Sequence, residues 1–338
     1  MSLETLQRKI LPQIEAALQS FLEAQAFGSS QPLKQMLSYH MGWEGENSGG
    51  GKRVRPFLTL LSALAFGGQI EISMPAAISI ELLHNFTLIH DDIEDRSPLR
   101  HGRPTLWQRW GIPQGINAGD ALFSIAHLAI LDLSKTCNPS IALQAARYLN
   151  QVCLNLTRGQ FLDIAFESHD SITLETYFEM ISGKTAALIG LCAALGGLTA
   201  GQNEEIVNKL FDFGESLGLA FQIKDDILGI WGDPKTTGKS TAGDILNRKK
   251  SFPILFGLGQ SPEFRTLWAE QAPSPDQVEH MAVLLEMCGA KDEALKKAES
   301  HTQNAFQIFA ALFPHPLDEN EYALAIAELC QQLLLREL

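Results

Sequence analysis

A short acidic stretch, LIHDDIEDR at residues 88–96, places four carboxylates within five positions directly after an apolar helical run. Like charges at helical spacing repel one another, so the stretch predicts a cation nearby. Asp91 and Asp95 are one helical turn apart and share a face, whereas Asp92 lies about 100° around the helix. Carboxylate oxygens in this DDxxD spacing suit Mg²⁺. The alternative for a single such stretch is a solvated acidic helix end.

A second acidic pair favours a metal site for both stretches. Asp225 and Asp226 follow another apolar helical run in the sequence FQIKDDIL, and Asp233 lies a little further along the chain. Two carboxylate-bearing helices that face each other could hold several divalent ions, and such a cluster would bind a diphosphate. The expected ligands of Mg²⁺ are Asp91, Asp92, Asp95, Asp225 and Asp226.

Basic residues occur near both acidic stretches, although the chain as a whole is acidic. In GKRVRP, at residues 51–56, Lys52 and Arg55 are three positions apart at the start of a helix and can converge on one anion. Arg100 follows the first acidic stretch. Further basic positions in the second half are Lys184, Lys239, Lys249 and Lys250. Any one of these alone is more often a solvated surface charge than a ligand.

One glycine-containing stretch imitates a nucleotide-binding loop. In GDPKTTGKS, residues 232–240, five residues separate Gly232 from Gly238, where a P-loop has about four. The stretch also follows a helical run and not a strand. We reject the nucleotide loop and keep Lys239 as an expected phosphate ligand.

The composition excludes several classes of protein. A net charge of −13 lacks the basic footprint that a nucleic-acid partner requires, and 45% apolar residues can bury a large core. Five cysteines without a CxxC pair predict neither a disulfide framework nor a zinc site, which fits a reducing cytosol. No basic-then-apolar leader opens the chain, and the apolar run at 185–200 is too short for a bilayer. We expect a cytoplasmic protein without a transmembrane segment.

The apolar residues recur with helical periodicity in nearly every segment, so the sequence predicts an all-α fold. None of the glycine- or proline-containing breaks is long enough for an interdomain linker, which predicts one domain over residues 1–338. The expected helices cover roughly residues 3–26, 31–40, 52–66, 73–95, 104–110, 117–134, 139–167, 173–198, 203–231, 242–258, 275–288, 292–311 and 320–336.

The motifs and their order resemble those of the trans-isoprenyl diphosphate synthases over most of the chain. They are GGGKRVRP, ELLHNFTLIHDDIED, LRHGRPT, GDALFS, GQFLDI, ISGKTAAL, FQIKDDILGIWGD and GKSTAGDILNRKKSFP. The resemblance implies a large helical bundle of the isoprenoid synthase type with a central cavity, usually a homodimer. It also implies a Mg²⁺-dependent enzyme that elongates an allylic diphosphate with isopentenyl diphosphate, head to tail.

The same resemblance assigns roles to individual residues. It implies that the aspartates of both motifs hold Mg²⁺ against the allylic diphosphate. It implies that this leaving group is also bound by Arg100, Lys184, Thr185, Gln222, Lys239 and Lys249. It places isopentenyl diphosphate on Lys52, Arg55 and His84. The residues expected to be catalytic are Asp91, Asp95, Lys184, Asp225 and Lys239.

Two histidines near the first acidic stretch receive different interpretations. His84 precedes Asp91 by seven residues, almost two helical turns, and therefore shares its face. It is either a core histidine or a diphosphate donor, and the resemblance favours the donor. His90 is expected to be structural, because the released diphosphate can itself accept the final proton.

Two positions depart from the family pattern. His101 stands where an arginine is common, which predicts a raised Michaelis constant for isopentenyl diphosphate that His101→Arg relieves. Gly229 stands where a third aspartate is common, which predicts that one metal ion is held less tightly.

Product length is expected to depend on Phe86 and Thr87, five and four positions before Asp91. This pattern resembles the archaeal kind of geranylgeranyl diphosphate synthase, in which a bulky residue at the position of Phe86 forms the cavity floor. It predicts a twenty-carbon product, with farnesyl diphosphate as the second choice. A terpene cyclase, which would not need Lys52, Arg55 and His84, and a noncatalytic partner subunit remain as less favoured alternatives.

Overall fold

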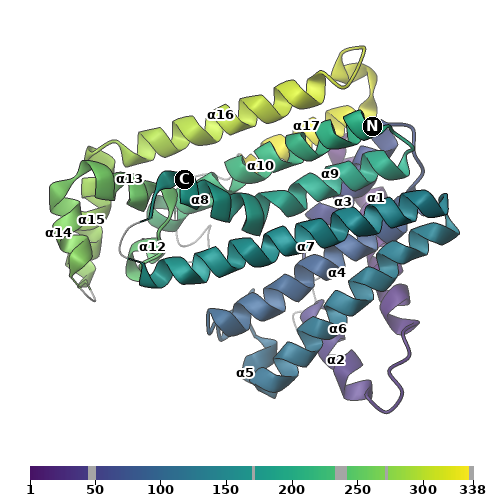
Figure 1. Cartoon of the computed structure of the whole chain (residues 1–338), viewed down its shortest axis with the longest axis horizontal. Helices are drawn as coiled ribbons and strands as arrows, with labels where there is room; N and C mark the ends of the chain where they lie inside the picture. The colour runs from purple at the N-terminus through teal and green to yellow at the C-terminus, as the bar shows by residue number, and fades with distance from the viewer. Residues whose placement is uncertain (45–50, 170–171, 233–241, 271–272, 335–338) are drawn as a thin grey trace. The chain divides into compact units, whose positions relative to one another are not determined.

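Helices build nearly all of the computed structural model, which describes residues 1–44, 51–169, 172–232, 242–270 and 273–334 (Figure 1). The predicted all-α fold is confirmed. The chain divides into two compact units, the first comprising Met1–Leu149, Cys192–Val207 and Asn320–Ile326, and the second Asn150–Leu191, Asn208–Glu319 and Ala327–Leu338. The expectation of a single domain stays a prediction.

The first unit is built around α4 (Ile70–Glu94) and α6 (Ile112–Leu131), which pack along each other. Gly119 permits this close approach, because a Cβ atom there would lie 2.2 Å from Nε2 of His90. His90 therefore packs against α6, in agreement with its expected structural role. The other elements are α1 (Leu3–Glu23), α2 (Gln31–His40), α3 (Val54–Ala65), β1 (Leu99–Arg100), β2 (Arg103–Pro104), α5 (Leu106–Trp110) and η1 (Asp132–Lys135).

The second unit holds most of the remaining helices, and the unit boundaries fall within α7, α9, α10 and α17. The elements are α7 (Pro139–Ser168), α8 (Leu174–Ile181), the π-helical turn η2 (Ser182–Ala186), α9 (Ala187–Thr199), α10 (Glu204–Trp231), α12 (Gly243–Leu246), α13 (Phe252–Gln260), α14 (Pro262–Ala269), α15 (Pro275–Met287), α16 (Ala290–Ala310), η3 (Leu317–Glu319) and α17 (Glu321–Leu334).

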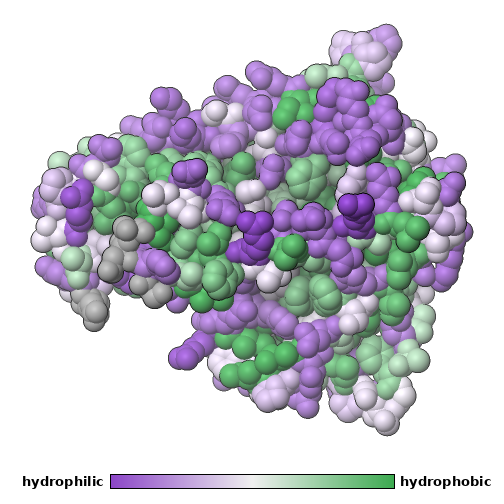
Figure 2. All heavy atoms as spheres, in the orientation of Figure 1, coloured by the Kyte–Doolittle hydropathy of each residue, from purple (hydrophilic) through white to green (hydrophobic). Residues whose placement is uncertain are grey.

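The helix α16 illustrates how amphipathic periodicity places a surface helix. Its buried residues recur on one side and are mostly small, with Phe309 at the far end. Figure 2 shows mainly hydrophilic side chains along its outer side. The buried set is Ala290, Ala294, Ala298, Ala305 and Phe309.

Some predicted helix boundaries are wrong, and local start signals explain them. The expected helix 242–258 is two helices, α12 and α13, because Pro253 occupies the first turn of a new helix. The helix α14 was not predicted. Its start has a visible signal, since the side chain of Ser261 accepts a hydrogen bond from the backbone nitrogen of Phe264 and Pro262 follows the cap.

Three helical segments are long and apolar enough to cross a membrane by length and composition: Ile70–Glu94, Ile112–Lys135 and Leu174–Thr199. In the last of these, 83% of the most apolar window is buried inside the protein. This burial favours the interpretation of that segment as a core helix. The absence of a transmembrane segment remains a prediction.

Candidate active site

The first acidic motif lies at the carboxyl end of α4, and its aspartates have different surroundings. Asp91 is half-buried and Asp95, which caps the helix, is exposed. Asp92 is only 2% exposed and pairs with Arg100. The helix therefore directs Asp92 into the protein and leaves Asp91 and Asp95 on the more accessible side.

Arg100 holds Asp92 from the hairpin formed by β1 and β2. Its Nε donates to both carboxylate oxygens of Asp92 at 3.0 Å, and Nη2 lies 2.9 Å from Oδ1. The tight turn of this hairpin contains His101 (φ 51°) and Gly102 (φ 74°). Burial raises the pKa of Asp92 above its usual value, although the hydrogen bonds and charge of Arg100 oppose that rise.

A basic site in the same unit is formed where α3 begins beside α4. Nη1 of Arg55 donates to Nε2 of His84 at 3.1 Å, so the structure brings two of the predicted diphosphate ligands together. Lys52, the third, is exposed at the start of this segment. Burial lowers the pKa of His84 well below its usual value, and the charge of Arg55 adds to the effect. His84 is therefore neutral here, and its Nε2 accepts the hydrogen bond from Arg55.

Arg53 in the same motif is structural. It is buried and adopts a left-handed backbone conformation with φ of 47°. Its guanidinium binds Glu15 at 2.9 Å, Glu81 at 2.8 Å and the carbonyl oxygen of Met41 at 2.9 Å. These bonds connect α1, α3, α4 and the chain after α2. They fix the start of α3, which positions Arg55.

The residues expected to set product length lie on α4 near α6. The ring of Phe86 is half-buried, with its centroid 5.0 Å from that of Phe123 and 4.9 Å from that of His90. The hydroxyl of Thr87 donates to the backbone oxygen of His84 at 2.8 Å. Phe86 and Phe123 thus form an aromatic pair between the two helices.

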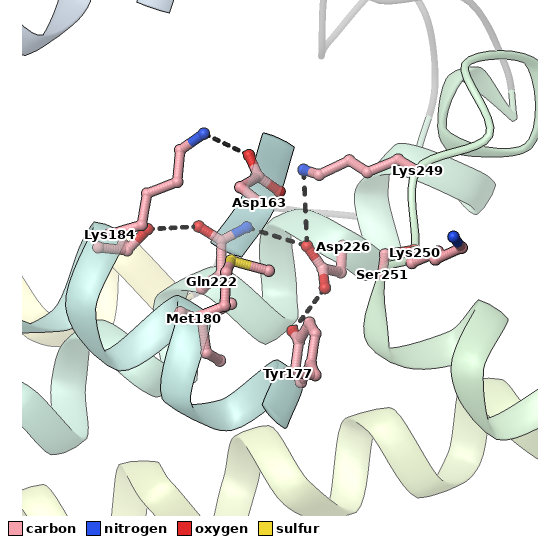
Figure 3. A pocket seen from close by; sticks show the side chains of 11 residues that line it. Asp163, Tyr177, Met180, Lys184, Gln222, Asp226, Lys249, Lys250 and Ser251 are labelled. Carbon is pink, nitrogen blue, oxygen red and sulfur yellow. Dashed lines mark hydrogen bonds and ion pairs between the residues drawn. The ribbon is translucent and has the colours of Figure 1, made fainter. Parts of the chain in front are cut away.

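A pocket lies in the second unit, between α7, α8, the π-helical turn, α10 and the segment before α13 (Figure 3). Glycine permits this assembly, because a Cβ atom on Gly159 would lie 2.2 Å from the backbone nitrogen of Lys184. The lining residues are Asp163, Tyr177, Met180, Ile181, Lys184, Thr185, Gln222, Asp226, Lys249, Lys250 and Ser251.

Asp226, at the base of this pocket, is 1% exposed and its carboxylate is held by protein donors. Oδ2 accepts hydrogen bonds from the hydroxyl of Tyr177 at 2.6 Å and from the backbone nitrogen of Phe252 at 3.0 Å. Oδ1 accepts from Nε2 of Gln222 at 2.9 Å. Burial raises the pKa of Asp226 above its usual value, and the charge of Lys249 with these hydrogen bonds opposes the rise.

The lysines of the pocket differ in direction (Figure 3). Nζ of Lys184 lies 2.5 Å from Asp163, and Nζ of Lys249 lies 4.0 Å from Asp226. Burial lowers the pKa of Lys249, but Asp226 and other nearby aspartates outweigh it and raise the pKa above its usual value. Lys250 points away and donates to the backbone oxygens of Phe166 and His169. Two ammonium groups therefore face the pocket.

At Gly229, where the second acidic motif lacks its third aspartate, the structure leaves no room for a side chain. A Cβ atom on Gly229 would lie between 2.5 and 2.7 Å from the carboxylate atoms of Asp244, which comes from α12. The carboxylate of Asp244 thus fills the space beside position 229. An acidic group is present there, contributed by another segment of the chain.

Sequence reasoning found most of these residues but missed several. Lys184, Thr185, Gln222, Asp226 and Lys249 line one pocket, and Thr185 donates to Gln222 at 2.8 Å. Lys239 and Asp233 lie outside the described residues, so their predicted roles stay predictions. The missed residues are Asp163, Tyr177 and Asp244. Asp163 and Asp244 had a signal, because they belong to the quoted motifs GQFLDI and GKSTAGDILNRKKSFP.

Within the described ranges, no group of three or more Asp, Glu, His or Cys side chains converges on one point. In the first motif the three aspartates do not converge, because Asp92 points towards Arg100. Mg²⁺ keeps several waters and commonly needs only one or two carboxylates beside a phosphate. Asp91 and Asp95, on one face of α4, fit that requirement, and so does the half-buried Asp225.

Comparisons with known proteins agree with this geometry. The family model described as polyprenyl synthetase matches residues 33–288. The chain is 39% identical over 285 residues to a geranylgeranyl diphosphate synthase of Mycobacterium tuberculosis, with 81% of each protein covered. It is 36% identical over 293 residues to a (2E,6E)-farnesyl diphosphate synthase of the same organism, covering 83% of this chain and 80% of that protein.

Solved structures show the same fold. The geranylgeranyl pyrophosphate synthetase of Pyrococcus horikoshii Ot3 matches with a TM-score of 0.88 and 30% identity over 99% of both chains. The geranylgeranyl pyrophosphate synthase of Corynebacterium glutamicum, complexed with isoprenyl diphosphate and magnesium, matches with a TM-score of 0.84 and 25% identity over 100% of both chains.

Proposed function

The chain belongs to the polyprenyl synthetase family, and from this membership we propose that it is a Mg²⁺-dependent prenyltransferase that condenses isopentenyl diphosphate with an allylic diphosphate, head to tail. The observation that carries the proposal is the pocket of Figure 3, in which Lys184 and Lys249 stand beside the second acidic motif. Cations and carboxylates together suit a metal-bound diphosphate, whereas either alone would not.

The leaving group is the diphosphate of the allylic substrate. When the carbon–oxygen bond breaks, its electron pair leaves with the diphosphate, and Lys184 and Lys249 stabilise that developing charge because they are already in place. Asp91 of the first motif and Arg100 of the following hairpin contribute another carboxylate and another cation. Mg²⁺ bound by Asp91, Asp95 and Asp225 would supply Lewis-acid stabilisation of the departing oxygens.

Isopentenyl diphosphate, the second substrate, needs a binding site of its own. We place the diphosphate of isopentenyl diphosphate on Lys52, Arg55 and His84, which hold the double bond within reach of the allylic carbon. The double bond attacks that carbon and forms the new carbon–carbon bond. A proton then leaves the adjacent carbon and passes to the released diphosphate. In this scheme His90 takes no part in the chemistry, since its ring packs against Gly119.

The decisive assay uses the purified chain, Mg²⁺, isopentenyl diphosphate and allylic starters of five, ten or fifteen carbons. Elongated prenyl diphosphates that appear only with divalent metal are the expected products. Cyclised hydrocarbons would identify a terpene cyclase. No consumption of any starter under these conditions would contradict an elongating enzyme and favour a noncatalytic subunit.

For product length we propose geranylgeranyl diphosphate, with Phe86 as the floor residue and Phe123 behind it. The aromatic pair supports this, because its two rings occupy the space between α4 and α6. Phe86 lies on α4 five residues before Asp91, the first aspartate of the acidic motif. Phe86→Ala should lengthen the products, as sized by chromatography. Phe161→Ala, at a 70% exposed position on α7, is the matched control. Unchanged lengths in Phe86→Ala would reject the floor assignment and leave farnesyl diphosphate as the second candidate.

We also propose a homodimer in the cytoplasm. Support for the dimer comes from large apolar residues exposed along α6, and support for the compartment from five free cysteines. Light scattering should give twice the chain mass of 37.1 kDa, and a monomer at micromolar concentration would contradict it. The exposed residues on α6 are Ile112, Ile116, Leu128 and Leu131.

A further inference from the structure

His40, at the end of α2, lies beside the basic site of the first unit but belongs to none of the motifs. The chain around it is held from two sides. Arg53 donates to the carbonyl oxygen of Met41 at 2.9 Å, and Arg103 donates to those of Tyr39 at 3.1 Å and Glu44 at 2.7 Å. The start of α3 and the hairpin thus fix the residues on either side of His40.

Two buried nitrogen atoms here have no hydrogen-bond partner within the described part of the chain. They are Nε2 of His40 and Nε of Arg55. A buried polar atom without a partner costs about 1–3 kcal/mol, and most native proteins avoid it. Two such atoms in one basic site indicate that a ligand completes their bonding.

The charges around His40 identify the ligand as an anion. Burial, together with the charges of Arg100 and Arg53, lowers the pKa of His40 to about 3, although a hydrogen bond to the backbone of Asn85 opposes this shift. Since Nε2 has no partner, the ring makes this last bond through Nδ1. The charged or titratable groups of the surrounding elements are Glu15, Arg53, Arg55, Glu81, His84, Arg100 and Arg103.

We propose that His40 is a further ligand of the isopentenyl diphosphate site, and that it takes up one proton from solvent when the diphosphate binds. Nε2 then carries the new proton and donates it in a hydrogen bond to a phosphate oxygen. The diphosphate brings negative charge into a cluster of guanidinium groups, which offsets the burial and the repulsion that together keep His40 neutral. The identity of this ligand rests on the proposed function, but the proton uptake does not require turnover.

Proton uptake by His40 makes the affinity for isopentenyl diphosphate depend on pH in a definite direction. A group that is protonated in the complex and neutral in the free protein makes binding stronger as pH falls. Isopentenyl diphosphate should therefore bind more tightly at pH 7 than at pH 8, beyond the change due to its own protonation. That change is common to all variants, so the comparison between variants isolates the contribution of His40.

The experiment is isothermal titration of the full chain with isopentenyl diphosphate alone, in two buffers of different ionisation enthalpy. Wild type should take up protons on binding. His40→Gln should bind on the order of tenfold more weakly, because it loses a charge-assisted hydrogen bond, and should take up about one proton fewer. His280→Gln, at an exposed position in the second unit, is the matched control and should match wild type in both quantities.

Steady-state kinetics separate this role from a structural one. His40→Gln should raise the Michaelis constant for isopentenyl diphosphate and leave that for the allylic substrate and kcat near wild type, with an unchanged melting temperature. Equal affinity and equal proton uptake in His40→Gln would overturn the proposal. If the variant fails to fold, the absence of proton uptake by wild type would overturn it equally. Failure of the proposed function is distinct, because it would show as no elongation by a wild type that still binds isopentenyl diphosphate.

Discussion

The two acidic motifs have the same Asp-Asp pair, yet the protein holds them by different means. In both, the first aspartate is half-buried and the second is almost fully buried. Asp92 is held by a cation, since Arg100 binds both of its carboxylate oxygens. Asp226 is held mainly by neutral donors, with Lys249 at 4.0 Å.

From this difference we infer that the two aspartates of each pair have different roles. The second aspartate fixes the local structure, because its oxygens are occupied by protein donors. We propose that the half-buried first aspartate is the one that binds metal. Because neutral donors bind the carboxylate of Asp226, the positive charge of Lys249 remains available to a diphosphate. Arg100, in contrast, is shared between Asp92 and the predicted ligand. We therefore expect different consequences when each residue is altered.

The largest effect should follow loss of the first aspartate in either pair. Asp91→Asn and Asp225→Asn should each lower kcat by on the order of a thousandfold, because a charged metal ligand becomes neutral. Radiolabelled isopentenyl diphosphate gives the rate. Asp292→Asn, an exposed change on α16, should keep wild-type activity. A loss of less than tenfold in both site variants would contradict the proposed difference in roles.

The next effect concerns the space beside Gly229. Restoring the third aspartate of the family pattern, Gly229→Asp, should lower activity by about tenfold or more, because the new carboxylate would meet that of Asp244. Gly229→Ala separates crowding from charge repulsion and should be less harmful. Gly259→Asp, at a position with open space, is the control. Higher activity in Gly229→Asp would show that Asp244 does not take the place of the missing group.

A moderate effect should follow removal of one neutral donor. Tyr177→Phe leaves a buried oxygen of Asp226 without its 2.6 Å hydrogen bond, which should reduce the free energy of unfolding by about 1–3 kcal/mol. Denaturant titration measures this. Tyr148→Phe, on α7, is a matched control outside the pocket. If Tyr177→Phe had the stability of wild type, the hydrogen bond from Tyr177 would not contribute to stabilising the buried carboxylate of Asp226.

The smallest effect concerns pH. Burial raises the pKa of Asp92 in the folded protein, so its favourable contribution is complete below the unfolded value near 3.8 and is lost as pH rises through the folded pKa. Relative to wild type, Asp92→Asn should therefore gain stability between acidic and neutral pH. Unfolding curves at several pH values test this. A stability difference that does not vary with pH would show that Asp92 has the same pKa in both states.

How far the sequence predicts this site depends on the distance over which its residues interact. The helices and the DDxxD spacing follow from local periodicity, so Asp91, Asp95 and Asp225 could be singled out. The partners of Asp226 could not, because Tyr177 and Phe252 lie 49 and 26 residues away along the chain. Asp244 belongs to a quoted motif, but its proximity to Gly229 is a tertiary contact that the motif does not reveal. Which aspartate of a pair turns inward depends on tertiary donors that no local pattern shows.

One predicted helix is wrong because of a local irregularity in the backbone. The π-helical turn at Ser182–Ala186 interrupts the expected helix 173–198, and it is there that Lys184 and Thr185 enter the pocket. Such turns frequently occur at functional sites, and simple apolar periodicity does not reveal them. The sequence identified Lys184 and Thr185 by resemblance, but not the backbone feature that presents them.

The central claim is that the first aspartates of both motifs bind Mg²⁺ against one allylic diphosphate. A crystal structure with Mg²⁺ and an unreactive thiolo analogue of the allylic substrate tests it most directly. The account predicts Mg²⁺ ions that link the diphosphate to Asp91 and Asp95 and to Asp225, with Asp92 still on Arg100 and Asp226 still on Tyr177. A diphosphate bound away from either motif, or without metal, would contradict it.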